Sequence, residues 1–406
     1  MEGAGDATTA ARPLKSQVVL YPTPGMGHLF AIVELGRALP ARGLAVTVVI
    51  VDPPYDTGAP GPVLAGVAAA NPSISFHRVP KVVDDLPPVA SKHYEALILE
   101  AVRAANPHLR ALLAAAPTRP AALVVDMFSD AALGVAGELG VPAYIFFTSG
   151  AAFLAFFLHL LALHARTAAS FREMGEELSL EFAEGGAECL PWLDRQPRAS
   201  VVFLCFGSLG RFSAEQTREL AAGLEASGQR FLWVVRALPP GDSADDDLAK
   251  KFGKPPEPDL DALLPDGFLR RIRDRGLIVK SWAPQRDVLA HGSVGGFVTH
   301  CGWNSVLEAV TAGVPMLGLP LHAEQRMNLV LLEKELQMAL PLEGYDRGMV
   351  AAEEVASKVR WLMDSDGGAM LRERTLAARA QAREALRHGG ESEAALAELV
   401  DLWRSS

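Results

Sequence analysis

Cysteine is scarce in this chain, with three among 406 residues, at positions 189, 205 and 301. Thiols so few and so widely spaced argue against a disulfide scaffold and suit a reducing compartment. Basic residues are also fewer than acidic ones: 38 Lys and Arg against 48 Asp and Glu give a net charge of −10. No basic face is evident to offset that balance, so we expect no nucleic-acid partner.

The chain also lacks an apolar run long enough to cross a bilayer. The strongest candidate, residues 143–165, is interrupted by Thr148, Ser149 and Gly150, and the apolar run after them is too short. A buried strand, a turn and a core helix are expected there instead. Residues 1–16 are small and polar without an apolar segment, which predicts a disordered lead-in and no signal peptide. We therefore expect a soluble, cytoplasmic protein.

One sequence of expected secondary-structure elements occurs twice in the chain. Residues 17–43 and 200–228 each read as an apolar strand, a Gly-containing turn and an amphipathic helix, and another apolar strand follows each. Ser213 and Gln216 form a candidate capping box at the start of the second helix. Strand–turn–helix–strand units imply parallel sheets, and two initiations predict an α/β chain of two doubly wound, Rossmann-like domains. Half of the residues are hydrophobic, enough for two cores.

The expected elements follow from apolar runs bounded by Gly and Pro. Strands are expected near 44–51, 73–77, 121–126, 142–147, 230–235, 277–282, 295–300 and 315–320, and helices from about 351 to the end. The expected units are a lead-in (1–16), an N-terminal domain (17–183), a C-terminal domain (184–390) and a closing helix (391–406) that packs back toward the N-terminal domain.

The stretch THCGWNS, residues 299–305, admits three interpretations. A closed zinc site is disfavoured because no second Cys or His stands near His300 and Cys301 at zinc spacing. A nucleophilic Cys301 would need a neighbouring base, so a thiol that faces the core or a site with little space fits better. The third interpretation is a strand, a turn at residues 301–302, and a helix capped by Asn304 or Ser305 that ends at Gly313. A helix N-terminus beyond a parallel strand suits phosphate, so this interpretation predicts a diphosphate site.

The stretch from Trp282 to Gln325, WAPQRDVLAHGSVGGFVTHCGWNSVLEAVTAGVPMLGLPLHAEQ, strongly resembles the signature box of plant family 1 UDP-glycosyltransferases. YPTPGMGH, VVDMF, ELGVPAYIFFTSGA and FGSLGRFSAEQ extend the resemblance through both halves, and the opening resembles the flavonoid, chalcone and anthocyanidin branch. The resemblance implies the GT-B fold, two Rossmann-like domains facing a cleft. It implies inverting transfer of glucose from UDP-glucose to a hydroxyl of a small apolar, phenolic acceptor, giving a β-O-glucoside.

The resemblance also assigns the donor residues of the C-terminal domain. It implies that Trp282 stacks on uracil while the Ala283 backbone reads the base edge, and that Gln285 and Glu308 bind the ribose. The residues implied for the phosphates are Ser208, His300, Gly302, Asn304 and Ser305. The residues implied for the sugar are Thr148, Trp303, Glu324 and Gln325.

The catalytic base is implied to come from the N-terminal domain. His28 follows the first strand and Asp126 ends another, so both lie at carboxyl edges of strands. Position alone would favour His28 as a helix-capping residue. By resemblance the two form a dyad in which His28 removes the acceptor proton and Asp126 fixes the ring tautomer. No metal or cofactor is implied, and the remaining histidines are expected to be structural or at the surface.

Three features depart from the family pattern. Leu319 stands where a tryptophan is usual, and His322 where tyrosine, serine or phenylalanine is common; both changes bear on the sugar pocket. After residue 178 the chain passes almost directly into CLPWLDRQP, where family members carry several dozen more residues. That shortening leaves an alternative open: a catalytically impaired paralogue that still binds UDP-sugar. An open sheet edge is also expected there.

An NAD-dependent dehydrogenase is the third hypothesis. Gly25, Gly27 and Asp52 partly match a dinucleotide fingerprint, but Phe30 stands where its last glycine belongs. The favoured hypothesis is a monomeric enzyme whose partners are a UDP-sugar donor and a small acceptor, with no membrane insertion.

Overall fold

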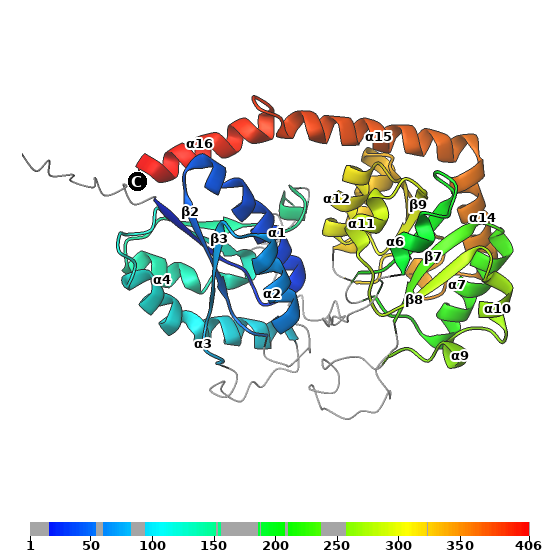
Figure 1. Ribbon diagram of the computed structural model, residues 1–406, viewed down its shortest axis with the longest axis horizontal. Coiled ribbons are helices and arrows are strands. Elements are labelled where there is room, and N and C mark those ends of the chain that lie inside the picture. The colour runs from blue at the N-terminus through cyan, green and yellow to red at the C-terminus, as the bar shows by residue number, and fades with distance from the viewer. Residues whose placement is uncertain are drawn as a thin grey trace, which may run out of the picture.

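The structure is a computed structural model in which two lobes lie side by side (Figure 1). It describes residues 16–53, 60–82, 94–151, 153–155, 186, 188–207, 210–236, 257–322 and 324–405. Each lobe contains one sheet, and every strand pairing in both sheets is parallel. Two parallel α/β lobes are the GT-B arrangement that the sequence predicts.

Among the described residues the N-terminal sheet contains five strands in the order β3-β2-β1-β4-β5. Their bounds are β1 Gln17–Tyr21, β2 Ala45–Ile50, β3 Ile74–Arg78, β4 Ala122–Asp126 and β5 Ala143–Phe146. The strand order reverses between β1 and β4, which pair directly with Tyr21 opposite Val125. Ligands of doubly wound folds bind where the order reverses, beyond the carboxyl ends of the strands.

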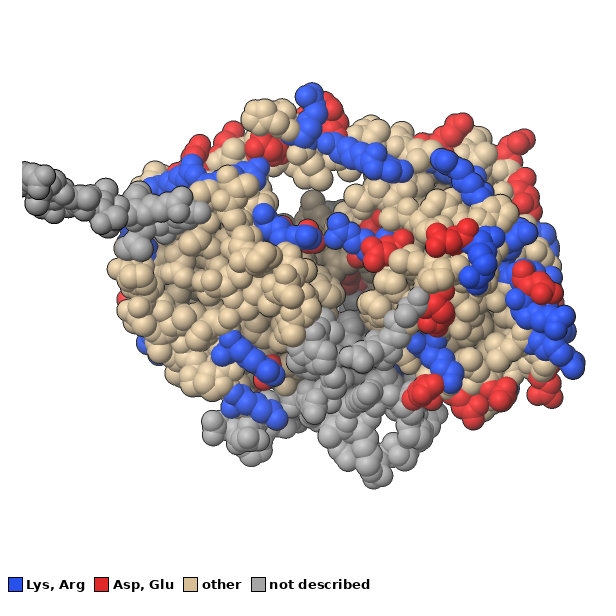
Figure 2. All heavy atoms as spheres, viewed as in Figure 1, with Lys and Arg blue, Asp and Glu red and all other residues tan. Residues whose placement is uncertain are grey.

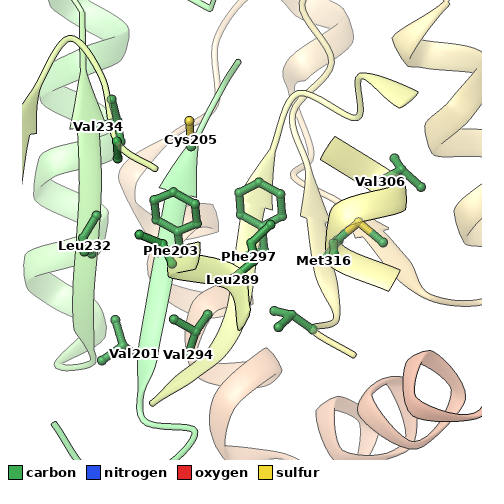
Figure 3. Packing of buried hydrophobic residues seen from close by; sticks show 14 of the residues in the cluster. Val201, Phe203, Cys205, Leu232, Val234, Leu289, Val294, Phe297, Val306 and Met316 are labelled. Carbon is green, nitrogen blue, oxygen red and sulfur yellow. The ribbon is translucent and has the colours of Figure 1, made fainter. Parts of the chain in front are cut away.

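In the part of the chain that the structure describes, the C-terminal sheet contains six strands in the order β11-β10-β9-β6-β7-β8. Their bounds are β6 Val201–Cys205, β7 Arg230–Val235, β8 Gly276–Lys280, β9 Val294–Thr299, β10 Met316–Gly318 and β11 Ala339–Pro341. Here the order reverses between β6 and β9. Phe203 and Phe297 on these two strands stack with ring centroids 5.3 Å apart and planes 11° from parallel (Figure 3). The parallel pairing of these strands extends to Cys205 opposite Thr299, so the carboxyl ends of β6 and β9 lie side by side.

Helices cover both sheets. In the N-terminal lobe they are α1 Met26–Ala38, α2 Pro60–Ala70, α3 Tyr94–Ala114 and α4 Ala132–Glu138, with short 3-10 turns η1 Pro40–Arg42 and η3 Met127–Ser129. In the C-terminal lobe they are α6 Cys189–Leu193, α7 Ala214–Ser227, α9 Leu260–Leu263, α10 Phe268–Ile272, α11 Gln285–Ala290, α12 Trp303–Ala312, α13 Gln325–Val330, the π-helical η5 Leu331–Glu335, η6 Tyr345–Arg347 and α14 Ala352–Asp364.

Two final helices connect the lobes. Helix α15, Asp366–Leu386, packs against α12 and α14, and α16, Glu391–Ser405, crosses to the N-terminal lobe (Figure 1). Val400 and Trp403 are buried there in the core formed by β1, β2 and α1. Beneath this pair of helices the molecule is hollowed between the lobes (Figure 2). None of the described helices is long and apolar enough to cross a membrane.

The structure corrects three local expectations. Strand β11 was not expected, because its three residues, 339–341, carry no β-branched side chain and end in proline. Of the capping box, only the bond from the Gln216 backbone N–H to Ser213 Oγ forms, at 3.1 Å. The Gln216 side chain instead bonds the backbone N–H and carbonyl of Val350, because those buried groups need partners. The third correction concerns the start of α12.

Candidate active site

A histidine and a carboxylate meet where the order of the N-terminal sheet reverses. His28 is the third residue of α1, and Asp126 is the last residue of β4. Because β1 and β4 are neighbours, the His28 Nδ1 atom lies 2.8 Å from Asp126 Oδ2. The Asp126 side chain is fully buried, whereas the His28 side chain remains 26% exposed. The pair therefore has one buried member and one member that solvent or a ligand can reach.

Polar groups around Asp126 keep its carboxyl ionised. Burial by itself would raise the pKa of Asp126, but hydrogen bonds and the charge of His28 outweigh it and lower that pKa. Thr23 Oγ1 donates to Asp126 Oδ1 at 2.7 Å, and the Phe128 backbone N–H donates to the same oxygen at 3.2 Å. An ionised carboxylate only accepts, so the proton of a neutral His28 imidazole lies on Nδ1 and Nε2 is left as an acceptor. That is the arrangement of a general base.

Thr23 is part of the hydrogen-bond network around Asp126, which the sequence analysis did not predict. Its hydroxyl contacts both Asp126 and Ser129, the latter at 3.0 Å. The available signal was a hydroxyl residue just beyond the carboxyl end of β1. Thr148, expected near the sugar or a phosphate, has its Oγ1 3.2 Å from His28 Nδ1.

Helix α12 of the C-terminal lobe begins earlier than the sequence predicts. We expected Asn304 or Ser305 to cap it, but it begins at Trp303 with Gly302 as the N-cap and no side-chain cap. The turn from β9 is short because Cys301 adopts a left-handed φ of 63°. No acidic residue lies in the first turn. The backbone N–H groups of that turn thus face no carboxylate cap, and the positive end of the helix suits an anion.

The His300 ring lies between two glycines at the point where β6 and β9 meet. A Cβ atom on Gly207 would be 2.7 Å from the ring, and one on Gly302 would be 2.4 Å from its Nε2 atom. Burial first, then His322 and Arg236, lower the pKa of His300 to about 3. The imidazole is therefore neutral near pH 7 and can act there as a hydrogen-bond donor, not as a cation.

A polar network extends from α11 to α12. The Gln285 side-chain Nε2 donates to Ser305 Oγ at 2.9 Å and to Glu308 Oε2 at 2.8 Å. Burial raises the pKa of Glu308, and the hydrogen bond from Gln285 partly opposes that rise. In the loop before α11, Trp282 is 36% exposed whereas Ala283 is buried. An exposed indole ring is available to stack on a planar ligand.

The residues expected at the sugar lie around the start of α13. The Gln325 Oε1 atom accepts the backbone N–H groups of Leu321 and His322, at 2.9 and 3.1 Å, so only its Nε2 remains to donate to a ligand. Glu324 is the N-cap of α13 and is half-buried. Leu319 is 3% exposed and packs in the core cluster beside α7 and α14.

The two halves of the site face each other across the lobe boundary. Asn304 Nδ2 donates to the Gly27 carbonyl oxygen at 3.2 Å. A Cβ atom on Gly150 would lie 3.1 Å from the Trp303 ring. The structure thus brings together His28, Asp126, Thr148 and the start of α12, which come from distant parts of the chain.

Other expectations meet the structure in different ways. Cys301 is fully buried and free, as expected of a core-facing thiol. Asp52, which the dinucleotide hypothesis requires, instead forms an ion pair with Arg78 at 2.8 Å. No group of metal ligands occurs among the described residues. Ser208 lies outside the described residues. So do residues 1–15 of the lead-in and residues 156–185 of the shortened junction.

Known proteins are similar to this chain over nearly its whole length. The family model described as "UDP-glucoronosyl and UDP-glucosyl transferase" matches residues 188–343. UDP-glycosyltransferase 1 of Pueraria montana var. lobata is 36% identical, with 96% of this chain and all of that protein aligned. Isoflavone 7-O-glucosyltransferase 1 of Glycine max is also 36% identical, covering 97% of this chain and all of the relative.

Solved structures of UDP-glycosyltransferases are also similar to this chain. The Phytolacca americana UGT2 complexed with UDP-2fluoro-glucose and pterostilbene superposes with a TM-score of 0.80 at 33% identity, covering 97% of this chain and all of the other. TcCGT1 in complex with UDP gives a TM-score of 0.83 at 29% identity, covering 97% of this chain and all of that one. The chain is therefore an enzyme of the plant family 1 UDP-glycosyltransferases, with the GT-B fold.

Proposed function

We propose that this enzyme transfers glucose from UDP-glucose to a hydroxyl of a small apolar phenol with inversion, giving a β-O-glucoside. One observation carries the proposal: the His28–Asp126 pair lies across the lobe boundary from the uncapped N-terminus of α12. Asn304 of α12 donates to Gly27, the residue before His28, so the two functional ends are adjacent. A base on one side and an anion site on the other suit attack on a sugar nucleotide.

The C-terminal lobe would hold the donor. In this proposal Trp282 stacks on uracil, the Ala283 backbone reads the base edge, and Gln285 with Glu308 binds the ribose. The 2.8 Å bond between Gln285 and Glu308 supports the last assignment, because it holds both side chains in place together. The residues proposed for the phosphates are Ser208, His300, Gly302, Asn304 and Ser305. Trp303, Glu324, Gln325 and Thr148 would surround the glucose.

The chemistry is a single displacement. His28 Nε2 takes the proton of the acceptor hydroxyl as its oxygen forms a bond to the anomeric carbon. The bond from that carbon to the diphosphate oxygen breaks, and UDP leaves with the electron pair. Attack from the face opposite UDP converts the α-linked donor into a β-glucoside. Asp126 stabilises the imidazolium, and the end of α12 stabilises the charge on UDP without a metal.

The phenolic acceptor is supported by relatives. One relative is named for an isoflavone, and the Anthocyanidin 5,3-O-glucosyltransferase of a Rosa hybrid cultivar is 35% identical over 95% of this chain. A third, the Phloretin 2'-O-glucosyltransferase of Pyrus communis, is 36% identical over 88% of the chain. The molecules in these three names all carry phenolic hydroxyls.

The test is incubation of the purified protein with UDP-glucose and a panel of isoflavones, anthocyanidins, dihydrochalcones and stilbenes. Mass spectrometry should find a glucoside, and NMR should show a β anomeric linkage. Formation of an α-glucoside would contradict the proposed inversion. UDP-galactose and UDP-xylose, offered in competition, test the choice of glucose. Preference for either would implicate Leu319 and His322, which depart from the family pattern.

The length of the chain favours a second candidate, a UDP-sugar-binding paralogue with impaired catalysis. The alignment with the Pueraria relative spans 486 positions, more than the 406 residues of this chain, so the relative has residues where this chain has none. A shortened junction before the second lobe would remove part of the acceptor wall. This candidate predicts UDP binding by calorimetry, weakened by Trp282→Ala, with no glucoside from any phenol.

A further inference from the structure

The short turn after β5 contacts both functional halves of the site. Thr148 Oγ1 lies 3.2 Å from His28 Nδ1. Two residues later, buried Gly150 faces Trp303: an added Cβ atom would lie 3.1 Å from ring atoms Cη2 and Cζ2 and 3.2 Å from Cε2. One turn of the N-terminal lobe therefore lies beside the base and against the first residue of α12.

Both sides of this contact make further contacts. The Trp303 ring packs against the core cluster of the C-terminal lobe. The next residue, Asn304, bonds to Gly27 in the opposite lobe. On the other side, the Gly150 carbonyl accepts the Leu154 backbone N–H at 3.0 Å. A larger residue at 150 would therefore push on the indole, and through it on the separation of the lobes.

The backbone at Gly150 is not what requires glycine. Its φ lies outside the left-handed region, unlike that of Gly140 at +63°. An alanine would adopt the same backbone without strain. The consequence of a side chain at 150 would thus come from its contact with Trp303.

We propose that Gly150 is a positioning residue for glucosyl transfer. Its missing side chain lets the N-terminal lobe close against the Trp303 indole, and this contact sets the distance between His28 and the N-terminus of α12. The inference rests on the proposed function. Displacement needs the reacting atoms about 3–3.5 Å apart, and a misplacement of about 1 Å can cost about 100-fold in rate. A shift of a few tenths of an ångström should have a smaller but measurable effect.

The first test is kinetic. Gly150→Ala should lower kcat by about 3- to 30-fold, while the Kd for UDP stays within about twofold because the C-terminal lobe holds the nucleotide. In a Trp303→Phe background, whose smaller ring leaves room for the added methyl, Gly150→Ala should lower kcat by much less. Gly134→Ala is the matched control, since a Cβ there meets nothing within 4 Å; it should match the unmodified enzyme.

The second test detects the contact between Gly150 and Trp303 by NMR and requires no catalytic turnover. The protein is labelled with 5-fluorotryptophan, and the Trp303 resonance is assigned by its loss in Trp303→Phe. Gly150→Ala should shift that ¹⁹F resonance, and Gly134→Ala should leave it in place. If the unmodified enzyme makes glucoside but Gly150→Ala changes neither kcat nor the resonance, or is equally harmful in both backgrounds, the inference is overturned. If the unmodified protein makes no glucoside, the proposed function fails. In that case the contact is still tested, because an unmoved Trp303 resonance in Gly150→Ala would overturn it.

Discussion

The Asn304 side-chain amide donates a hydrogen bond to the Gly27 carbonyl oxygen, 3.2 Å away, across the boundary between the lobes. Gly27 precedes the candidate base, and Asn304 lies in the first turn of the candidate anion-binding helix. Glu34 of α1 and Arg286 of α11 form a second contact between the lobes, at 3.3 Å. Both partners of that pair are exposed, so it adds at most about 1 kcal/mol. Of these two polar contacts, only the one made by Asn304 joins the residue before the candidate base to the first turn of α12.

Loss of the base should slow transfer strongly without weakening donor binding. His28→Ala should lower kcat by about 10²- to 10⁴-fold, the usual contribution of a positioned general base. Asp126→Asn should also lower kcat, because an amide no longer fixes the proton on Nδ1. Calorimetry should give a Kd for UDP within about twofold of the unmodified enzyme, since the proposed phosphate site is in the other lobe.

The matched control is His291→Ala. It removes another His–Asp pair, in which His291 Nε2 lies 3.1 Å from Asp194 Oδ1, outside the site. Its kcat should equal that of the unmodified enzyme. Turnover retained in His28→Ala would remove the base assignment.

The stability of the enzyme in acid should depend on His300. The pKa of His300 lies at about 3 in the folded chain, below its ordinary value of 6.5. Between those values the unfolded chain binds a proton at this residue and the folded chain does not, so the free energy of unfolding falls as pH falls from about 6.5 towards 3. His300→Gln cannot titrate, so urea unfolding should show a shallower decline over that range. An unchanged decline would contradict the neutral, buried imidazole.

The His300 ring should tolerate no side chain at residue 302. Gly302 has an ordinary φ of −60°, so alanine fits its backbone, but the new Cβ would lie 2.4 Å from His300 Nε2. Gly302→Ala should therefore displace the ring and raise the Kd for UDP about 10- to 100-fold, as expected on losing a hydrogen bond to a charged group. Gly292→Ala, with open space at the Cβ position, is the control and should bind UDP normally. Normal UDP binding by Gly302→Ala would remove His300 from the phosphate site.

The closing helix should contribute strongly to the stability of the N-terminal lobe. Trp403 is 1% exposed within that lobe's core and contacts Tyr144 with ring centroids 5.7 Å apart. Trp403→Ala should lower the free energy of unfolding by about 3–5 kcal/mol through the cavity it creates. Trp403→Phe should cost less, since the indole Nε1 has no hydrogen-bond partner among the described residues. Urea unfolding measures both, and Glu398→Ala, on the exposed face of α16, should change little.

Apolar runs bounded by glycine and proline predicted most of the strands. The run at 230–235 coincides with β7, and 121–126 differs from β4 by one residue. These strands are buried on both faces, so their sequences are continuously apolar. The segment at 339–341 lacked that signal because it is short and lies at the edge of its sheet. The expected open edge stays a prediction, because residues 156–185 lie outside the described part of the chain; among the described residues β5 is the last strand of its sheet.

The start of α12 shows where local patterns stop being sufficient. Asn and Ser favour N-caps, so the sequence placed the helix start at 304 or 305. In the fold, Asn304 bonds to Gly27 and Ser305 accepts from Gln285, while Cys301 shortens the turn. Tertiary partners outweighed the capping preference. The same outcome freed the helix terminus that the proposed function uses.

The sequence by itself determined two parallel α/β lobes and the positions of His28 and Asp126 at the carboxyl ends of strands, because hydrophobic periodicity and turn residues act over short distances. Only the tertiary structure decided that β1 lies beside β4, that β6 lies beside β9, and that Gly27 and Gly150 meet α12. Those contacts join residues up to 277 positions apart, and strand order and lobe packing are fixed by long-range burial.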